Sequence, residues 1–125
     1  MSANLGGISV LVVEDEGKQA NDMQHALEDA GASVIGPVGH VEDAWDIVDL
    51  PQVDCAILDV SQHGPLIYPV ADVLLEHDVP VIFVAYADEE LPQRYLGLPL
   101  VRKPLSMEFL THTVEQELSG ITSTE

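Results

Sequence analysis

The chain has 125 residues, of which 46% are hydrophobic, a formal net charge of −18 and a single cysteine. This length is typical of one domain that closes a single apolar core without disulfide bonds or metal ions. The negative charge argues against nucleic acid or an anionic membrane as a direct partner, because their phosphates would be repelled. The apolar blocks are too short for a membrane span, and the first residues lack the features of a signal peptide. With Cys55 alone no intramolecular disulfide can form, so we expect a cytoplasmic protein.

Two kinds of pattern alternate along the chain. Short, β-branched apolar runs predict strands, and several are apolar at nearly every position, as in strands buried on both faces of a parallel sheet. Amphipathic segments with helical spacing lie between them. In chain order we expect strand 8–13, a helix around 20–30, strand 32–38, helix 41–48, strand 54–60, a helix from about 65 to 76, strand 80–85, a weak helix within 87–96, strand 99–102 and a helix from about 106 to 118.

The helix within 87–96 has the weakest pattern. Pro92 interrupts this segment, and Gly97 ends it. Proline removes a backbone donor and clashes with the preceding turn, so this helix is expected to be short.

The last helix has clear signals at both ends. Ser106 is its expected N-cap and Gly120 its expected stop. The domain is therefore predicted to have a core at about 7–119 and a flexible polar tail at 120–125.

Five alternations of strand and helix predict an α/β fold. We expect a (βα)5, doubly wound, five-stranded parallel sheet in a three-layer α/β/α arrangement, with right-handed crossovers. In such sheets ligands bind beyond the carboxyl ends of the strands, near the point where the strand order reverses.

Charged residues gather at three of these strand ends. Glu14 and Asp15 follow the first strand, Asp59 ends the third, and Lys103 with Pro104 follows the fifth. The interval from Asp15 to Asp59 equals that from Asp59 to Lys103. Crowded carboxylates raise one another's pKa unless a cation compensates, and hard oxygen ligands suit Mg²⁺. A fixed lysine opposite them suits a phosphoryl oxygen, so the pattern indicates phosphoryl transfer.

Four segments in this order, VLVVEDE, AILDV, PVIFVA and VRKP, resemble the receiver domains of two-component response regulators, the CheY-like family with a flavodoxin-like fold. The resemblance covers nearly the whole chain. It implies that Asp59 is the aspartate that accepts a phosphoryl group. It also implies that Lys103 pairs with Asp59 before transfer and with the phosphoryl group afterwards. Pro104 would fix the turn after this lysine, in the family as a cis peptide bond.

The same resemblance implies a metal site. Asp15, Asp59 and the backbone carbonyl of Ser61 would ligate Mg²⁺, or another divalent cation such as Mn²⁺. Glu14 would act through a metal-bound water. Glu16, by contrast, is expected only to cap the following helix.

Two positions depart from the family pattern. Receivers usually carry Thr or Ser at the end of the fourth strand and an aromatic residue three positions before the lysine. Here these switch positions hold Ala85 and Leu100. The region resembles the FAT GUY subgroup with its Thr-Gly lost, leaving Ala85 followed by Tyr86. We therefore expect phosphorylation without the usual conformational relay, and the segment 87–97 is the candidate to move instead.

The resemblance implies a single-domain response regulator, since no DNA-binding or catalytic output segment follows. It would take a phosphoryl group from a histidine kinase or a histidine phosphotransfer protein, by self-catalysed chemistry rather than as a dedicated enzyme. It would act by binding a downstream protein target or as a phosphate shuttle or sink, with no nucleic acid or membrane partner. Three alternatives stay open: a pseudo-receiver that binds partners unmodified, a haloacid dehalogenase-type phosphohydrolase, for which Ser61 replaces an expected Asp, and a flavodoxin-like cofactor binder.

Overall fold

The computed structural model describes residues 3–48, 52–61 and 64–122. Its strands form one parallel sheet in the order β2-β1-β3-β4-β5. The strands are β1 (Ser9–Val13), β2 (Ser33–Val38), β3 (Cys55–Asp59), β4 (Val81–Ala85) and β5 (Leu100–Arg102). All five predicted strands are therefore confirmed, and the doubly wound fold class with them.

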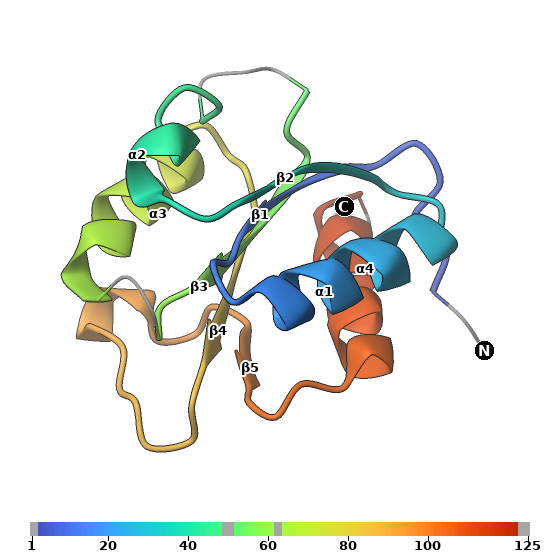
Figure 1. Cartoon of the computed structure of the whole chain (residues 1–125). Helices are drawn as coiled ribbons and strands as arrows, with labels where there is room; N and C mark the ends of the chain where they lie inside the picture. Colours follow the sequence, from blue (N-terminus) through green and yellow to red (C-terminus); the bar gives the residue numbers. More distant parts are fainter. Residues whose placement is uncertain (1–2, 49–51, 62–63, 123–125) are drawn as a thin grey trace.

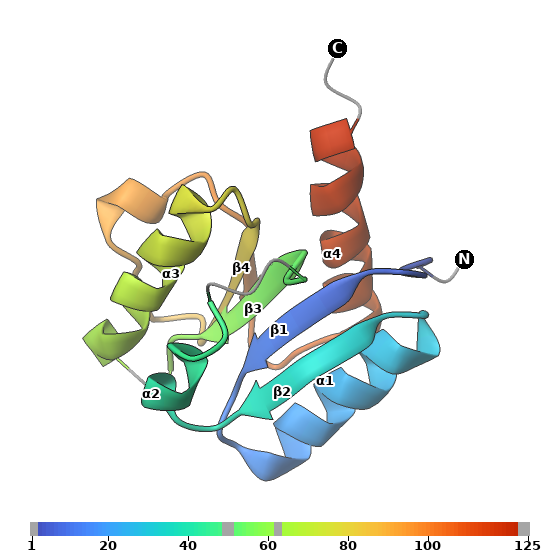
Figure 2. The same ribbon diagram turned by 90° about the horizontal axis from the view of Figure 1, so that it is seen from above.

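Helices cover both faces of the sheet, as three layers require. The helices are α1 (Gly17–Asp29), α2 (Val41–Ala44), α3 (Ile67–Glu76) and α4 (Met107–Thr122). Figures 1 and 2 show α1 and α4 on one face and α2 with α3 on the other. Among the described residues, no helix is long and apolar enough to cross a membrane.

The strands are apolar at successive positions because each face has its own core. Leu11 and Val13 of β1 pack in the α2 and α3 layer, whereas Val10 and Val12 pack in the α1 and α4 layer. Successive side chains of a strand point to opposite faces, so a strand covered on both sides has no polar position to offer. The fully buried cysteine, Cys55, belongs to the α1 and α4 layer, as a structural thiol.

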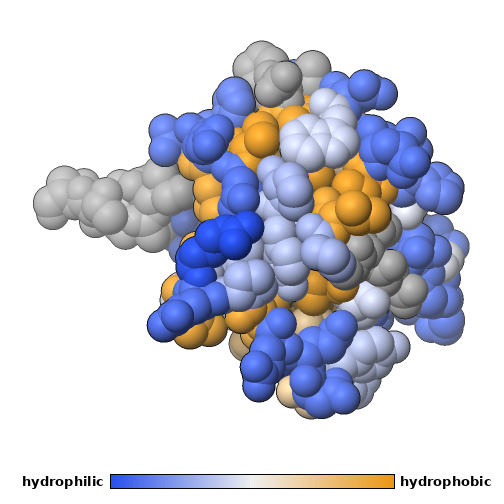
Figure 3. Space-filling view, turned by 90° about the vertical axis from the view of Figure 1, so that its left-hand side faces the viewer, coloured by the Kyte–Doolittle hydropathy of each residue, from blue (hydrophilic) through white to orange (hydrophobic). Residues whose placement is uncertain are grey.

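The α2 and α3 layer leaves some apolar surface open. Figure 3 faces this side and shows hydrophobic patches between hydrophilic side chains. Trp45, Leu66 and Leu96, next to or within the short helical segments of this side, are exposed. This layer therefore covers the sheet without closing all of its own apolar surface.

Two predicted helix boundaries are wrong. The helix expected at 41–48 ends at Ala44 and continues as turns, although Val48 remains buried. The last helix continues past Gly120 to Thr122. A glycine costs a helix only about 1 kcal/mol relative to alanine, which the preceding turns of α4 can absorb. Of the expected tail, residues 123–125 lie outside the described part of the chain.

The connection between β4 and β5 contains no α-helix. Its one helical segment is a single 3₁₀ turn, η2 (Gln93–Tyr95), shorter than the short helix that the sequence predicts. Pro92 has extended backbone dihedrals and precedes this turn directly, so the helical hydrogen bonds start only after it. Two other helix starts agree with the sequence. The helical region expected from about 65 begins with the 3₁₀ turn η1 (Gly64–Leu66), and Ser106 caps α4 as predicted.

Candidate functional site

Asp59 ends β3 and is fully buried, with 0% exposure, at the carboxyl edge of the sheet. Its Oδ2 lies 2.8 Å from Nζ of Lys103. Its Oδ1 accepts a hydrogen bond of 2.8 Å from the backbone N–H of Ser61. A charge without water must be paired and hydrogen-bonded, and both oxygens of this carboxylate meet that condition.

The strand order explains this placement. The chain runs from β1 outwards to the edge strand β2 and then returns to β3 on the other side of β1. The carboxyl ends of β1 and β3 therefore lie side by side where the order reverses, which is the ligand-binding edge of such sheets. Lys103 reaches the same edge because β5 ends at Arg102 and the Lys103 N–H donates to the carbonyl of Ala85. The Lys103–Pro104 peptide bond is cis, as the resemblance implies.

Glu14 is buried beside Asp59, with 2% exposure. It accepts hydrogen bonds from Nε2 of Gln19 at 2.9 Å and from the backbone N–H of Glu16 at 3.1 Å. Burial raises the pKa of Glu14, and its hydrogen-bonding contact with Asp59 raises it further, to about 7. One carboxyl of the pair therefore holds a proton more readily than a free glutamate does.

Asp59 and Lys103 stabilise each other's charged forms. Burial raises the pKa of Asp59, but hydrogen bonds from Glu14, Lys103 and the Ser61 backbone lower it more, so it lies below its ordinary value. Burial lowers the pKa of Lys103, but the contact with Asp59 raises it more. The site thus holds an ionised aspartate against an ammonium group, with Lys103 Nζ also 4.7 Å from the centre of the Tyr86 ring.

The donor set fits a divalent cation in its chemistry. Two carboxyl groups in contact carry hard oxygen atoms, and a cation would relieve the repulsion that raises the pKa of Glu14. Asp15 lies next in sequence but is exposed. Within the described ranges no three His, Cys, Asp or Glu side chains already form a metal-binding group. Asp15 would therefore have to turn towards Asp59 to complete the ligand set. Glu16 caps α1, as predicted, by accepting from Gln19 N–H.

The two switch positions have no polar group at the site. Ala85 is fully buried at the end of β4, and Leu100 is half-buried at the start of β5. The connection after β4 instead supplies a carboxylate that contacts Ser61. Glu89 Oε1 accepts hydrogen bonds from Ser61 Oγ at 2.8 Å and from the Tyr86 N–H at 2.7 Å.

Glu89, Tyr86 and Arg102 were missed as site residues by the sequence analysis. A usable signal existed, since the acidic run Asp88–Glu90 follows a buried strand end just as Glu14 does. What the sequence could not give is the turn that brings Glu89 back to Ser61.

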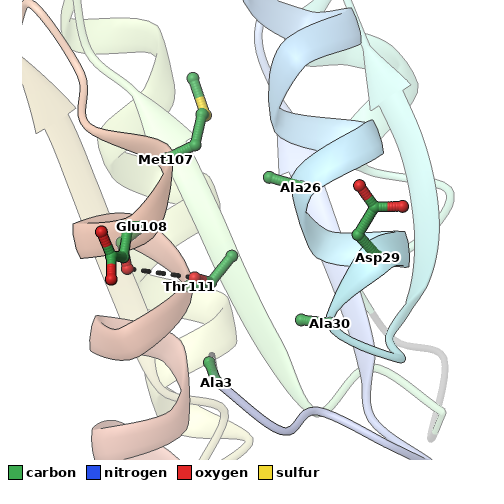
Figure 4. A pocket seen from close by; sticks show the side chains of 7 residues that line it. All are labelled: Ala3, Ala26, Asp29, Ala30, Met107, Glu108 and Thr111. Atoms are coloured by element: carbon green, nitrogen blue, oxygen red, sulfur yellow. Dashed lines mark hydrogen bonds between the residues drawn. The ribbon is translucent and has the colours of Figure 1, made fainter. Parts of the chain in front are cut away.

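A separate pocket lies between α1 and α4. It is lined by Ala3, Ala26, Asp29, Ala30, Met107, Glu108 and Thr111. Figure 4 shows small side chains of α1 facing the first turns of α4, where Thr111 Oγ1 donates to the Glu108 carbonyl. None of its lining residues belongs to the Asp59 cluster, so we do not assign it to the same site.

Similar structures come from one class of signalling protein. The BeF3-activated conformation of SdrG from Pseudomonas melonis Fr1 is 31% identical, with a TM-score of 0.73, and the match covers 94% of this chain and 99% of that one. A response regulator receiver protein from Burkholderia phymatum is 26% identical, with a TM-score of 0.76, over 90% of this chain and 95% of that one. No protein-family model matches the chain, and no curated protein matches it by sequence.

A third similar structure belongs to a longer protein. The anti-anti-sigma factor PhyR from Bartonella quintana is 24% identical, with a TM-score of 0.78, over 93% of this chain but only 50% of that one. The chain therefore spans about half the length of this PhyR. Together with the strand order and the position of Asp59, these similarities define a receiver fold. The chain belongs to the response regulator receiver domains. Its place in the FAT GUY subgroup stays a prediction.

Proposed function

We propose that this receiver accepts a phosphoryl group on Asp59 from a histidine kinase or a histidine phosphotransfer protein. The observation that carries the proposal is the buried, ionised Asp59 paired at 2.8 Å with Lys103 beside Glu14. A carboxylate oxygen has two lone pairs, so each oxygen of Asp59 can keep its present partner and still offer electrons.

The transfer balances as a simple displacement. An Asp59 oxygen attacks phosphorus, the new O–P bond forms as the N–P bond of the phosphohistidine breaks, and the nitrogen keeps the electron pair. Lys103, whose pKa lies above its ordinary value, remains protonated and can pair with a phosphoryl oxygen. Glu14 and the Ser61 N–H keep Asp59 oriented.

Mg²⁺ or Mn²⁺ is part of the proposal. Asp15, Asp59 and the Ser61 carbonyl would hold it, with Glu14 acting through a water molecule. The ion would supply positive charge to the phosphoryl oxygens in the transition state. The chemistry is self-catalysed, so we do not propose a dedicated enzyme.

The physiological role that we propose is cytoplasmic signalling through protein partners. The similarity to SdrG in a BeF3-activated conformation and to the anti-anti-sigma factor PhyR supports a role in protein-protein signalling. The chain would act by binding a downstream protein or as a shuttle or sink of phosphoryl groups.

A second candidate is a pseudo-receiver that binds its partner unmodified. Ala85 and Leu100 favour it, because they remove the hydroxyl and the aromatic ring through which receivers usually respond. The intact Asp59–Lys103 pair instead favours a receiver that is phosphorylated on Asp59.

Intact mass separates these two functions. The protein is incubated with Mg²⁺ and either acetyl phosphate or a phosphorylated kinase, and the mass of one phosphoryl group is sought. We expect the adduct in the wild type and in Asp88→Asn, an exposed aspartate that serves as a matched control. We expect none in Asp59→Asn. A wild type that forms no adduct with any donor contradicts the proposal and leaves the pseudo-receiver.

A further inference from the structure

A second carboxylate, that of Glu89, is linked to Asp59 through hydrogen bonds of Ser61. Ser61 donates its backbone N–H to Asp59 Oδ1 at 2.8 Å and its Oγ–H to Glu89 Oε1 at 2.8 Å. Ser61 therefore bridges two acidic groups from different parts of the chain, one at the end of β3 and the other in the connection after β4.

The segment 86–89 is held beside the site by five further contacts. The Tyr86 N–H donates to the Glu89 carboxylate at 2.7 Å, and the Glu89 N–H donates to the Tyr86 carbonyl at 3.1 Å. Arg102 donates to the carbonyl oxygens of both Tyr86 and Glu89. The Tyr86 ring lies against Lys103 Nζ. This tight turn is thus tied to the Glu89 side chain, to Arg102 at the end of β5 and to Lys103 directly after it.

The Glu89 carboxylate has no cationic partner among the residues that the structure describes. Lys103 pairs with Asp59, and Arg102 contacts only the backbone carbonyl of Glu89. Two neutral donors, the Ser61 hydroxyl and the Tyr86 N–H, hold the carboxylate in place. Such bonds keep an anion in position but leave its charge uncompensated.

A phosphoryl group on Asp59 would bring about 1.5 to 2 negative charges to this site. Only Ser61 separates it from the Glu89 carboxylate, and like charges in a partly buried site are poorly screened. The bridge through Ser61 is therefore favourable with a bare Asp59 and unfavourable with a phosphorylated one.

We propose that Glu89 is a positioning residue that acts through Ser61 to oppose phosphorylation of Asp59, and that the phosphoryl group in turn displaces Glu89 and opens the 86–89 turn. The proposal rests on the function proposed above and adds the group by which this chain responds. Repulsion between the phosphoryl group and Glu89 would thus take the part that a hydroxyl at position 85 plays in other receivers.

The first experiment measures the initial rate of phosphorylation by acetyl phosphate and Mg²⁺, read by intact mass, in the wild type, Glu89→Gln and Glu90→Gln. Glu90 is the matched control, since it is the adjacent, exposed carboxylate and makes no contact with Ser61. We expect a rate increase of at least about threefold in Glu89→Gln, from the lost repulsion, and little change in Glu90→Gln.

Salt distinguishes charge from structure. At about 1 M NaCl the Debye length falls to about 3 Å, so the advantage of Glu89→Gln over the wild type should shrink, but not to onefold, because a partly buried pair of charges is screened less than an exposed one. A merely structural role of Glu89 would slow the reaction in the variant at every salt concentration. Equal or slower phosphorylation of Glu89→Gln in low salt, with an active wild type, overturns the proposal.

The second experiment follows displacement by amide exchange with beryllofluoride and Mg²⁺. In the wild type the Tyr86 N–H should lose protection, because its acceptor is the Glu89 carboxylate. The Tyr95 N–H, bonded to the Pro92 carbonyl, should keep its protection as an internal control. Unchanged protection of Tyr86 contradicts displacement. If neither the wild type nor any variant forms an adduct, the proposed function itself fails. If the wild type is active and Glu89→Gln only matches its rate, the proposed function stands and the role of Glu89 fails.

Discussion

The two halves of the connection between β4 and β5 are held in different ways. Residues 86–89 are held by hydrogen bonds of charged groups beside the Asp59–Lys103 site. Residues 93–96 carry the η2 turn and are held by aromatic packing against α3. Neither half contains an α-helix, yet each has its own attachment.

Tyr95 is the centre of the second attachment, with 1% exposure. Its ring stacks on Tyr68 with 5.3 Å between centroids and lies 5.0 Å from Phe83. Its hydroxyl donates to Asp72 and to the Tyr68 carbonyl, while Arg94 pairs with Asp72 and covers the ring.

The difference between the halves is their dependence on charge at Asp59. A phosphoryl group on Asp59, as proposed above, would change the strength of a hydrogen bond to the Glu89 carboxylate but not the buried area of the aromatic rings. Because the connection between β4 and β5 contains no α-helix, its first half could then move while its second half stays in place. This divides the segment 87–97, which the sequence analysis takes as one pliable unit, into two parts.

The largest expected effect breaks the aromatic attachment. Tyr95→Ala should lower the free energy of unfolding by about 3–5 kcal/mol, since it leaves a cavity between Tyr68 and Phe83. Urea denaturation measures the change. Tyr86→Ala, at an exposed ring, is the control and should cost under about 1 kcal/mol. Equal losses in the two variants would contradict the assignment of Tyr95 as the anchor.

The Glu14–Asp59 pair and the Tyr95 attachment should also differ in pH dependence. The folded pKa of Glu14 is raised above its ordinary value of 4.5 to about 7, so its contribution to stability is fully present below pH 4.5 and is lost as pH rises through about 7. We expect a loss of roughly 1–3 kcal/mol over this window in chelator-containing buffer. Denaturation at a series of pH values measures it, and Glu14→Gln should flatten the curve.

The aromatic side titrates in another window. Burial and the contact with Asp72 raise the pKa of Tyr95 to about 12 from its ordinary value of 10. Its contribution to stability is present below pH 10 and is lost only as pH rises towards 12. For Glu14, a wild-type curve of unfolding free energy against pH without a decline between pH 4.5 and 7 would contradict the burial of its uncharged form.

A smaller effect should appear when the first half is loosened directly. Arg102→Gln weakens the bonds to the carbonyl oxygens of Tyr86 and Glu89, which are worth about 1 kcal/mol at an exposed position. Amide exchange of the Tyr86 and Glu89 N–H groups should accelerate about fivefold. Exchange at Tyr95 should stay unchanged, and acceleration there would show that the two halves are one unit.

The smallest effect concerns the exposed ion pair of the second half. Arg94→Gln removes the pairing with Asp72 at 3.1 Å, and both side chains are largely exposed. Such pairs contribute under about 1 kcal/mol, and salt screens them. Thermal unfolding in low and high salt should show a difference from the wild type only in low salt. A larger, salt-independent loss would mean that Arg94 acts by covering the Tyr95 ring.

Local patterns sufficed for much of this protein. The strand positions follow from β-branched runs, and Pro92 predicted that the helical segment between β4 and β5 would be short. Asp59 and Lys103 could be identified because the carboxyl ends of neighbouring parallel strands meet at one edge. Helix ends were less predictable, since Gly120 is a plausible stop that the preceding turns of α4 override.

The sequence by itself determined the order of strands and helices along the chain and the meeting of Asp59 with Lys103, because these depend on periodicity and on one rule of sheet topology. The tertiary structure alone decided the ionisation of those groups and which other residues contact them. The pKa of Glu14 depends on burial beside Asp59, and the Ser61–Glu89 contact joins residues 28 positions apart. Such contacts leave no periodic trace in a sequence, since they arise only when separate connections meet at the same edge of the sheet.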